Sequence, residues 1–106
     1  MAQSPKATIA PLDSLRAIIR DKRRGLELTQ EQLSFLTGYD RTYINRVERG
    51  KRNPSFTAIL NICSVLRITP SATMRTVEAE AGFEFISEQQ LAIGLLKRKR
   101  VAKFKR

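Results

Sequence analysis

Histidine and tryptophan are absent from this sequence of 106 residues, and cysteine occurs once, as Cys63. Because histidine is the commonest general base and metal ligand of proteins, its absence argues against acid–base catalysis and against a metal site. One cysteine excludes an intrachain disulfide and fits a reducing compartment. The sequence also lacks a glycine-rich phosphate loop and any apolar run of about 18 residues, the length of a transmembrane helix. We therefore expect no enzyme, no cofactor, no metal and no membrane insertion.

Basic residues outnumber acidic residues in this sequence. The sequence has 20 basic and 10 acidic residues, a formal net charge of +10. A surplus of this size favours a polyanionic partner and binding that weakens as salt is added. Residues 1–77 carry 13 basic and 6 acidic side chains, residues 78–96 carry 4 acidic and no basic ones, and residues 97–106 carry 7 basic and no acidic ones. An acidic segment therefore separates two basic regions.

A short helix is predicted to begin after Thr29. Thr29 and Gln32 have the spacing of a capping box, in which each side chain accepts a hydrogen bond from the other residue's backbone N–H. Leu28 and Leu33 have the spacing of a hydrophobic staple. Leu33 is predicted to face the core, and the other two residues expected there are Leu36 and Phe35.

Gly38 is predicted to end this helix, because glycine adopts the left-handed conformation at little steric cost. Asp40 is then placed to cap a second short helix, from Arg41 to about Arg49. Ile44 and Val47 lie three residues apart and are expected to be buried together. The opposite side of this helix is left to solvent, and it carries Arg41, Thr42, Asn45, Arg46 and Arg49.

Two short helices cannot form a core alone, and helical patterns are present on both sides of them. The preceding pattern consists of Leu12, Leu15, Ile19 and Leu26, with Gly25 near its end. The following one consists of Phe56, Ile59, Leu60, Cys63 and Leu66, after the start signal Asn53, Pro54 and Ser55. Thr69 and Pro70 begin a fifth helix that includes Met74 and Val77 and ends at Gly82. Cys63 is expected to be a small buried side chain and not a nucleophile.

The predicted fold is all-α, a compact five-helix domain followed by a C-terminal extension. We expect a flexible arm at residues 1–10, the helical domain at residues 11–82 and the extension at residues 83–106. Within the extension, Phe83 to Ile86 forms either a strand or an apolar linker. A further helix is predicted from about Glu88, because Ser87 and Gln90 repeat the capping-box spacing. Its apolar residues are Leu91, Ile93, Leu95 and Leu96, and its basic end continues to Arg106.

The segment from Thr29 to Ser55 resembles the helix-turn-helix domain of the lambda-repressor and Cro type. The similarity lies in TQEQL, DRTYI and ERG followed, after one residue, by RNPS. The last two motifs are especially similar to restriction–modification controller proteins and small repressors. About two-thirds of the chain is covered by this resemblance. It implies sequence-specific binding of double-stranded DNA, usually as a dimer, in bacteria or their phages and mobile elements.

The resemblance also implies roles for individual residues. Arg41, Thr42 and Arg46 match positions that contact bases, and a guanidinium can bind a guanine edge with two hydrogen bonds. Gln30 matches a residue that binds phosphate at the N-terminus of its helix, where an anion is favoured. The residues that match backbone or flanking contacts are Gln30, Tyr43, Asn45, Arg49, Lys51, Arg52 and Asn53.

An internal ion pair is a further implication of the resemblance. Glu48 matches a buried glutamate whose partner is an arginine of the first helix, and Arg23 has the matching offset. The sequence departs from the family pattern nearby, because Glu27 stands where a glycine commonly precedes the second helix by two residues. The connection between the first two helices can therefore differ, in which case Arg20 or Arg24 replaces Arg23 as the partner of Glu48.

The expected function is that of a small transcription regulator, either a repressor or an activator, in the bacterial cytoplasm on the nucleoid. A homodimer would place one recognition helix in each half of an inverted repeat, with half-sites about 34–36 Å apart or a multiple of this. RNA polymerase or a regulatory protein is a possible further partner. Two alternatives are an antitoxin or anti-regulator that acts mainly through a protein, and a nonspecific nucleic-acid-binding protein. Residues 74–96 are expected to contribute to the dimer contact. Residues 97–106 are expected either to bind DNA or to form a solvated tail.

Overall fold

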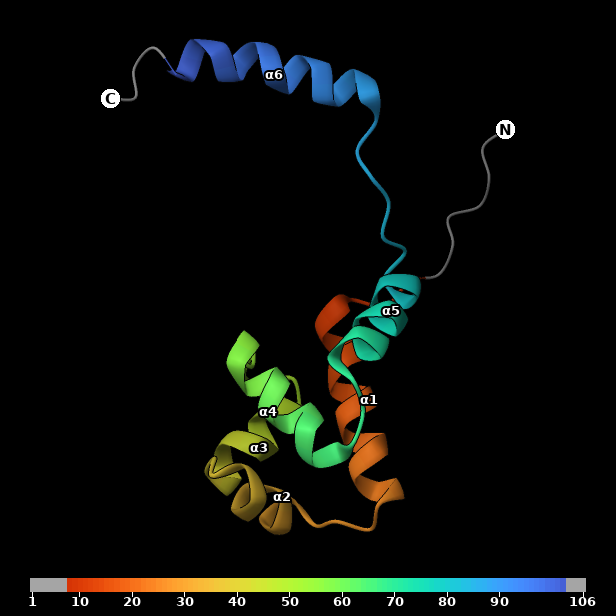
Figure 1. Cartoon of the computed structure of the whole chain (residues 1–106), viewed down its shortest axis with the longest axis vertical. Coiled ribbons are helices and arrows are strands. Elements are labelled where there is room, and N and C mark those ends of the chain that lie inside the picture. The colour runs from red at the N-terminus through yellow and green to blue at the C-terminus, as the bar shows by residue number, and fades with distance from the viewer. Residues whose placement is uncertain (1–7, 103–106) are drawn as a thin grey trace.

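The computed structural model describes residues 8–102, and the side chains of residues 8–97. Over this range the chain forms six helices and no strand, which confirms the all-α prediction. The helices are α1 (Pro11–Gly25), α2 (Gln30–Thr37), α3 (Arg41–Glu48), α4 (Phe56–Leu66), α5 (Pro70–Glu80) and α6 (Glu88–Ala102). Figure 1 shows α1 to α5 gathered into one body, with α6 standing apart from it beyond α5. The predictions for residues 1–7 and 103–106 lie outside the described residues.

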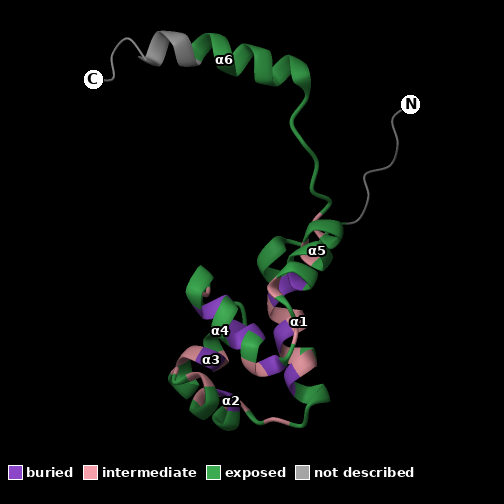
Figure 2. Ribbon diagram, viewed as in Figure 1, coloured by how far each residue is buried: buried purple, intermediate pink, exposed green. Residues whose placement is uncertain are grey.

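Buried residues of the first four helices form the core of the body. Figure 2 shows the buried residues concentrated where α1, α3 and α4 face one another, with α6 exposed along its described length. Apolar side chains without hydrogen-bonding groups fill this space, and their removal from water stabilises the fold. The core consists of Leu15, Ile19, Leu33, Ile44, Val47, Ile59, Ile62, Cys63 and Leu66.

The local signals for α2 are confirmed. Gln32 N–H donates to Thr29 Oγ1 over 3.0 Å, and Thr29 N–H donates to Gln32 Oε1 over 2.8 Å. Leu28 packs against the core, in which Leu33 is fully buried. Gly38 ends the helix with a φ of 81°, a conformation that costs an ordinary residue about 1–2 kcal/mol. The turn between α2 and α3 is therefore set by residues local to it.

Two predicted core residues of α2 are exposed. Phe35 has an exposed fraction of 84% and Leu36 one of 54%. The prediction was wrong because α2 has only eight residues and meets α3 and α4 along one side, where Leu33 lies. Phe35, two positions after Leu33, points to another side of the helix, and Leu36 lies in its last turn. They leave an apolar surface open on α2.

The apolar stripe of α4 is rotated from its predicted position. Phe56 is 69% exposed and Leu60 is 39% exposed, whereas Ile62 is fully buried. The reason is that α4 packs against α1, α2 and α5, which together cover a different arc of this helix from the one that the sequence spacing suggested. The buried arc consists of Ala58, Ile59, Ile62, Cys63 and Leu66.

Other predicted features of the flanking helices are confirmed in part. Ser55 caps α4 by accepting from Ala58 N–H, and Thr69 caps α5 by accepting from Ala72 N–H, with Pro70 as the first helical residue. In α1, Leu15 and Ile19 are buried, but Leu12 and Leu26 are each 40% exposed, because they lie at the helix ends. Met74 is 38% exposed, Val77 is half-buried, and Thr73 takes the buried place on α5.

The beginning of α1 and the end of α5 are tied together. Ile9 N–H donates to the carbonyl of Glu80 over 3.0 Å, and Ser14 Oγ donates to the Glu80 carboxylate. The ends of the body's first and last helices therefore meet, and the extension leaves from that point. Phe83 to Ile86 contains neither a strand nor a helix, which settles the choice left open by the sequence. The capping box of Ser87 and Gln90 is present at the start of α6, with bonds of 3.0 and 3.1 Å.

Candidate nucleic-acid interface

The surface of α3 has two distinct sides. Ile44, Val47 and Glu48 are buried, which fixes one side of the helix in the body. The other side is open to solvent and carries Arg41, Thr42, Arg46 and, at the helix end, Arg49. No carboxylate of the described residues forms a salt bridge with these arginines. This side of α3 therefore presents several hydrogen-bond donors and positive charge to a partner outside the chain.

Both ends of α3 differ slightly from the prediction. Asp40 occupies the N-cap position with extended backbone, but its side chain makes no capping hydrogen bond. The predicted cap is therefore wrong in its chemistry, and the carboxylate contributes only favourable charge near the helix N-terminus. At the other end α3 stops at Glu48, and Arg49 is the C-cap, with its N–H donating to Asn45 O over 3.0 Å.

The ion pair expected for Glu48 is present, and Arg23 is its partner. Arg23 Nε donates to Glu48 Oε2 over 2.7 Å, and Arg23 Nη2 donates to Glu48 Oε1 over 2.9 Å. Arg23 is 8% exposed and Glu48 is 4% exposed. Hydrogen bonding to the Glu48 carboxylate raises the pKa of Arg23 against the opposing effect of burial. The guanidinium therefore stays charged at any pH at which the protein would be studied.

The two other candidate partners of Glu48 have other positions. Arg20 Nε donates to Asp21 Oδ1 over 3.3 Å, and Arg24 is exposed. Arg23 also donates from Nη1 to the carbonyl of Leu28 over 2.7 Å. One buried guanidinium thus connects α1 to α3 and to the segment that leads into α2.

The unusual residue of that segment, Glu27, has a φ of 61°. The backbone therefore takes the left-handed conformation at the position where the family pattern has a glycine, although the side chain here is a glutamate. Gly25, by contrast, is the last residue of α1 and does not supply a positive φ. The connection between α1 and α2 consequently keeps the family's offset of Arg23 and carries local backbone strain.

Gln30 lies at the first position of α2 and is half-buried. Its Nε2 donates to Glu48 Oε1 over 3.0 Å, and its Oε1 accepts from Asn45 Nδ2 over 3.2 Å. Sequence reasoning assigned this residue to phosphate and missed both contacts. A spacing of 15 or 18 residues between polar side chains carries no recognisable signal, so only the fold brings these groups together.

The loop after α3 folds back on that helix. Gly50 has a φ of 75°, and the N–H groups of Lys51 and Arg52 both donate to the carbonyl of Arg46, over 2.8 and 3.2 Å. The Arg52 guanidinium lies 5.2 Å from the centre of the Tyr43 ring, a cation–π distance. The loop's basic side chains are thereby held beside the exposed side of α3.

Tyr43 is also part of an aromatic pair. Its ring centre lies 5.2 Å from that of Tyr39, and Asn61 Nδ2 donates to Tyr39 Oη over 2.8 Å. Tyr43 is half-buried and packs against the core. It therefore supports Arg52 and the turn before α3 at once.

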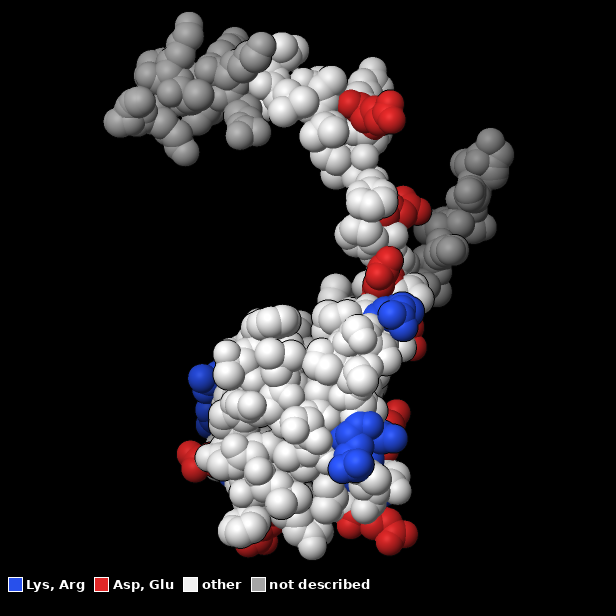
Figure 3. All heavy atoms as spheres, viewed as in Figure 1, with Lys and Arg blue, Asp and Glu red and all other residues white. Residues whose placement is uncertain are grey.

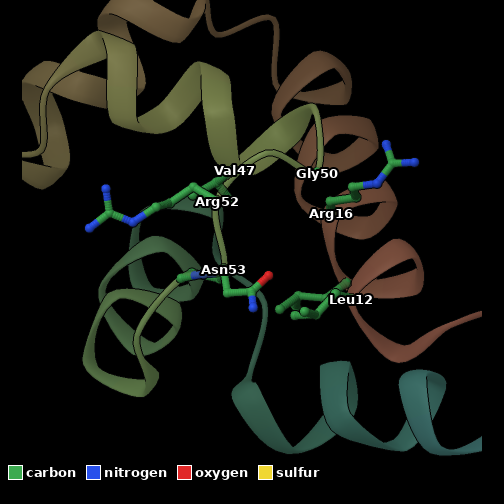
Figure 4. A pocket seen from close by; sticks show the side chains of 8 residues that line it. Leu12, Arg16, Val47, Gly50, Arg52 and Asn53 are labelled. Carbon is green, nitrogen blue, oxygen red and sulfur yellow. The ribbon is translucent and has the colours of Figure 1, made fainter.

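A small hollow lies between the loop and α1. Figure 4 shows Leu12, Val47 and Asn53 around it, with the Arg16 and Arg52 side chains directed away from each other. Arg16 Nη1 donates to the carbonyl of Glu48 over 3.3 Å. A Cβ added to Gly50 would lie 3.1 Å from Arg16 Nε, so this glycine permits the close approach of α1 as well as the turn.

Four acidic residues lie between the end of α5 and the start of α6. Figure 3 shows acidic side chains along the connection that leads from the end of α5 into α6. In the sequence these are Glu78, Glu80, Glu84 and Glu88. The exposed arginines of α3 and the acidic segment therefore lie on separate parts of the molecule.

Along residues 8–102, no helix has the length and apolarity needed to cross a membrane. Likewise, no cluster of three or more histidine, cysteine, aspartate or glutamate side chains in this range has the arrangement of a metal site. Cys63 is buried, as predicted, with its Sγ 3.8 Å from Thr73 Oγ1.

The sequence profile described as helix-turn-helix matches residues 19–72, just over half of the chain. No curated protein sequence matches this chain. Among solved structures, the restriction-modification controller protein C.AhdI from Aeromonas hydrophila is 40% identical, over 61% of this chain and 98% of its own, with a TM-score of 0.57. The wild-type controller protein C.Esp1396I is 27% identical, over 66% of this chain and 92% of its own, with a TM-score of 0.60.

A further structure contains the C.Esp1396I tetramer in complex with its natural 35-base-pair operator. Its chain is 26% identical, over 69% of this chain and 96% of its own, with a TM-score of 0.60. The matched region includes α2, α3 and the loop after them. The predicted resemblance is confirmed: this chain belongs to the helix-turn-helix family, and it is similar to restriction-modification controller proteins.

Proposed function

We propose that the protein is a sequence-specific regulator of transcription that binds double-stranded DNA through α3 and has no enzymatic activity. One observation carries this proposal: the exposed side of α3 presents Arg41, Thr42 and Arg46, while the opposite side is fixed in the core. A helix held rigidly in this way fits the major groove, where base edges differ in their hydrogen-bonding groups. The similarity to a controller protein bound to its operator supports the same reading.

The proposed roles of the side chains follow from their positions. Arg41 and Arg46 each bind a guanine edge, and Thr42 offers its hydroxyl to a base or its methyl group to a thymine. Backbone contacts set the register but carry no sequence information. The residues around α3 are assigned to contacts with the DNA backbone or with flanking bases, namely Gln30, Tyr43, Asn45, Arg49, Lys51, Arg52 and Asn53. Arg23 and Glu48 contribute by holding the end of α3 in place.

The proposed domain boundaries follow the break between body and extension. Residues 11–82 form the DNA-binding domain, preceded by an arm at residues 1–10, and residues 83–106 form an extension for dimerisation and for additional contact with DNA. A bacterial regulator of this kind would act in the cytoplasm, on the nucleoid. RNA polymerase is a suitable further partner if the protein activates transcription.

A homodimer held partly by α6 is the proposed assembly. Leu91, Ile93, Leu95 and Leu96 are 48–65% exposed, although a helix of this length is only marginally stable alone in water. Antiparallel pairing with a second α6 would place the basic run from Lys97 beside the partner's Glu88, whereas parallel pairing would place two basic runs together. Gly94, near the centre, has no atom within 4 Å of an added Cβ and would let the helices approach closely.

A protein partner that is not a second copy is the next candidate, and it is favoured by the surface of α2. Leu28, Glu31, Gln32, Phe35 and Leu36 line an open groove. A phenylalanine exposed by 84% is unusual in a small soluble domain and marks a possible protein contact. An antitoxin or anti-regulator that acts through this groove would co-purify with its partner.

Selection of bound duplexes from a random pool tests the proposed function. An enriched word with inverted-repeat symmetry would support a dimer that reads DNA through α3. A pool that gains no preferred word, with equal affinity for scrambled duplexes, would instead identify a nonspecific nucleic-acid-binding protein driven by charge. A DNA mixture of matched length and composition provides the reference affinity.

A further inference from the structure

Four side chains from three helices form one continuous chain of hydrogen bonds. Arg23 of α1 donates to the Glu48 carboxylate of α3 over 2.7 and 2.9 Å. Gln30 of α2 donates from Nε2 to Glu48 Oε1 over 3.0 Å, and Asn45 of α3 donates from Nδ2 to Gln30 Oε1 over 3.2 Å. The chain begins at a buried charge and ends on the exposed side of α3.

The direction of these bonds is fixed by chemistry. An ionised carboxylate can only accept hydrogen bonds, so Gln30 must turn its NH₂ group towards Glu48. The Gln30 carbonyl oxygen then faces Asn45, and Asn45 must turn its own NH₂ group towards it. Rotating the Gln30 amide by half a turn would place its oxygen against the Glu48 carboxylate and its NH₂ group against that of Asn45. Both contacts would be repulsive, and the Arg23–Glu48 pair therefore orients two amides in succession.

This orientation determines what Asn45 offers to a partner. Asn45 lies one helical turn after Arg41 and three residues after Thr42, and it is half-buried beside the exposed side of α3. No donor among the described residues bonds to its Oδ1. Asn45 therefore keeps two free groups, its Oδ1, which accepts, and the second N–H of Nδ2, which donates.

We propose that Asn45 is a base-selecting residue and that Gln30 is the residue that orients it. This inference rests on the proposed binding of α3 in the major groove. With its amide held in this orientation, Asn45 selects adenine, whose N6 amino group donates to Oδ1 and whose N7 accepts from the second N–H. Guanine offers two acceptors, O6 and N7, so one of its two contacts would place an acceptor against Asn45 Oδ1.

A different explanation is that the hydrogen bonds only hold α2 against α3. In that case, loss of the Gln30 amide would loosen the helix-turn-helix unit and weaken binding to every duplex by the same factor. If Gln30 orients Asn45, its loss removes the preference at one base pair of each half-site and leaves the others. The two explanations therefore differ in the pattern of base preference as well as in affinity.

The experiment uses the full chain and the DNA word that it selects. Binding is measured by competition against duplexes in which each base pair of the word is replaced in turn by the other three. Asn45→Ala identifies the base pair that loses its preference. Gln30→Met, which keeps the length of the side chain but has no amide, is expected to lose the preference at the same base pair, from about tenfold to less than twofold, because each good base contact discriminates by about 1–3 kcal/mol. The preferences assigned to Arg41 and Arg46 are expected to remain.

Gln32→Met is the matched control. Gln32 also lies in the first turn of α2, but its amide caps that helix and does not contact Asn45. This variant is expected to lower stability and to keep the wild-type pattern of base preference. A Gln30→Met protein that keeps the wild-type pattern, or that weakens all duplexes equally, would overturn the inference.

Asn45→Asp provides a second test that leaves Gln30 intact. Aspartate has no N–H, so it can donate neither to Gln30 Oε1 nor to adenine N7. The preference for adenine at the identified base pair should therefore fall, with lower affinity overall because of repulsion from phosphates. An undiminished preference for adenine at that base pair would contradict the inference. A wild-type protein that selects no word at all would refute the proposed function itself, and with it this role of Asn45.

Discussion

Arg23 and Glu48 form a buried, two-point ion pair between α1 and the end of the recognition helix, with N–O distances of 2.7 and 2.9 Å. Removing one partner leaves a buried charge without compensation. We expect Glu48→Ala to lower the free energy of unfolding by about 3–5 kcal/mol, a large share of the stability of a small domain. Urea denaturation followed by circular dichroism measures this loss.

The double variant Arg23→Met, Glu48→Met is the control for that prediction. It removes both charges and fills a similar volume, so it should be more stable than Glu48→Ala, although Leu28 O loses a donor. A loss below about 1 kcal/mol for Glu48→Ala would show that water reaches the site and that the pair contributes little.

Glu27 is expected to limit the stability of the domain through its backbone. Its φ of 61° is a left-handed conformation that glycine adopts without steric cost. We predict that Glu27→Gly raises the free energy of unfolding by up to about 1 kcal/mol. Glu31→Gly, which places the same exchange in the first turn of α2, should lower it. Thermal unfolding of the two variants would settle the matter, and a destabilised Glu27→Gly protein would contradict the argument.

The sequence predicted the features that depend on neighbouring residues. The capping box of Thr29 and Gln32 and the turn at Gly38 are encoded within a few positions, and the family resemblance supplied the Arg23–Glu48 pair. The sequence pattern predicted burial wrongly where burial depends on which helices surround an element. Phe35 is apolar at a helical spacing yet exposed, because α2 meets its neighbours along one side only.

The candidate site shows the same division. The exposure of Arg41 and Arg46 follows from the burial of Ile44 and Val47 on the other side of the same short helix. The contacts of Gln30 required the packing of α2 against α3, since its two partners, Asn45 and Glu48, lie 15 and 18 residues away in the sequence. Local chemistry and family pattern therefore located the site, while its internal hydrogen bonds came only from the fold.

Lys51 is expected to contact phosphate and not a base. Each neutralised phosphate releases counterions from duplex DNA and steepens the dependence of affinity on salt. Lys51→Ala should weaken binding to specific and random duplexes by similar factors, and lower the slope of log K against log salt by about 1. Fluorescence anisotropy at several salt concentrations measures the slope, and an unchanged slope would remove Lys51 from the phosphate contacts.

Leu95 is expected to lie in the dimer contact of α6. It is 48% exposed in the single chain, and a charge placed there would oppose burial against a second helix. We predict that Leu95→Glu shifts the protein towards monomer in sedimentation experiments and weakens binding to an inverted repeat more than to a single half-site. Gln89→Glu, which adds the same charge at a polar position of α6, is the control. Equal molar mass for wild type and Leu95→Glu over a range of concentrations would exclude α6 from the interface.

Arg46→Ala tests the central claim, that the exposed side of α3 reads bases. Duplexes are selected from a random pool with the wild-type and the variant protein, and the two enriched words are compared position by position. The account predicts that the variant loses about 1–3 kcal/mol on the wild-type word and accepts any base at one position of each half-site. Identical words for the two proteins, or equal weakening on specific and random DNA, would contradict it.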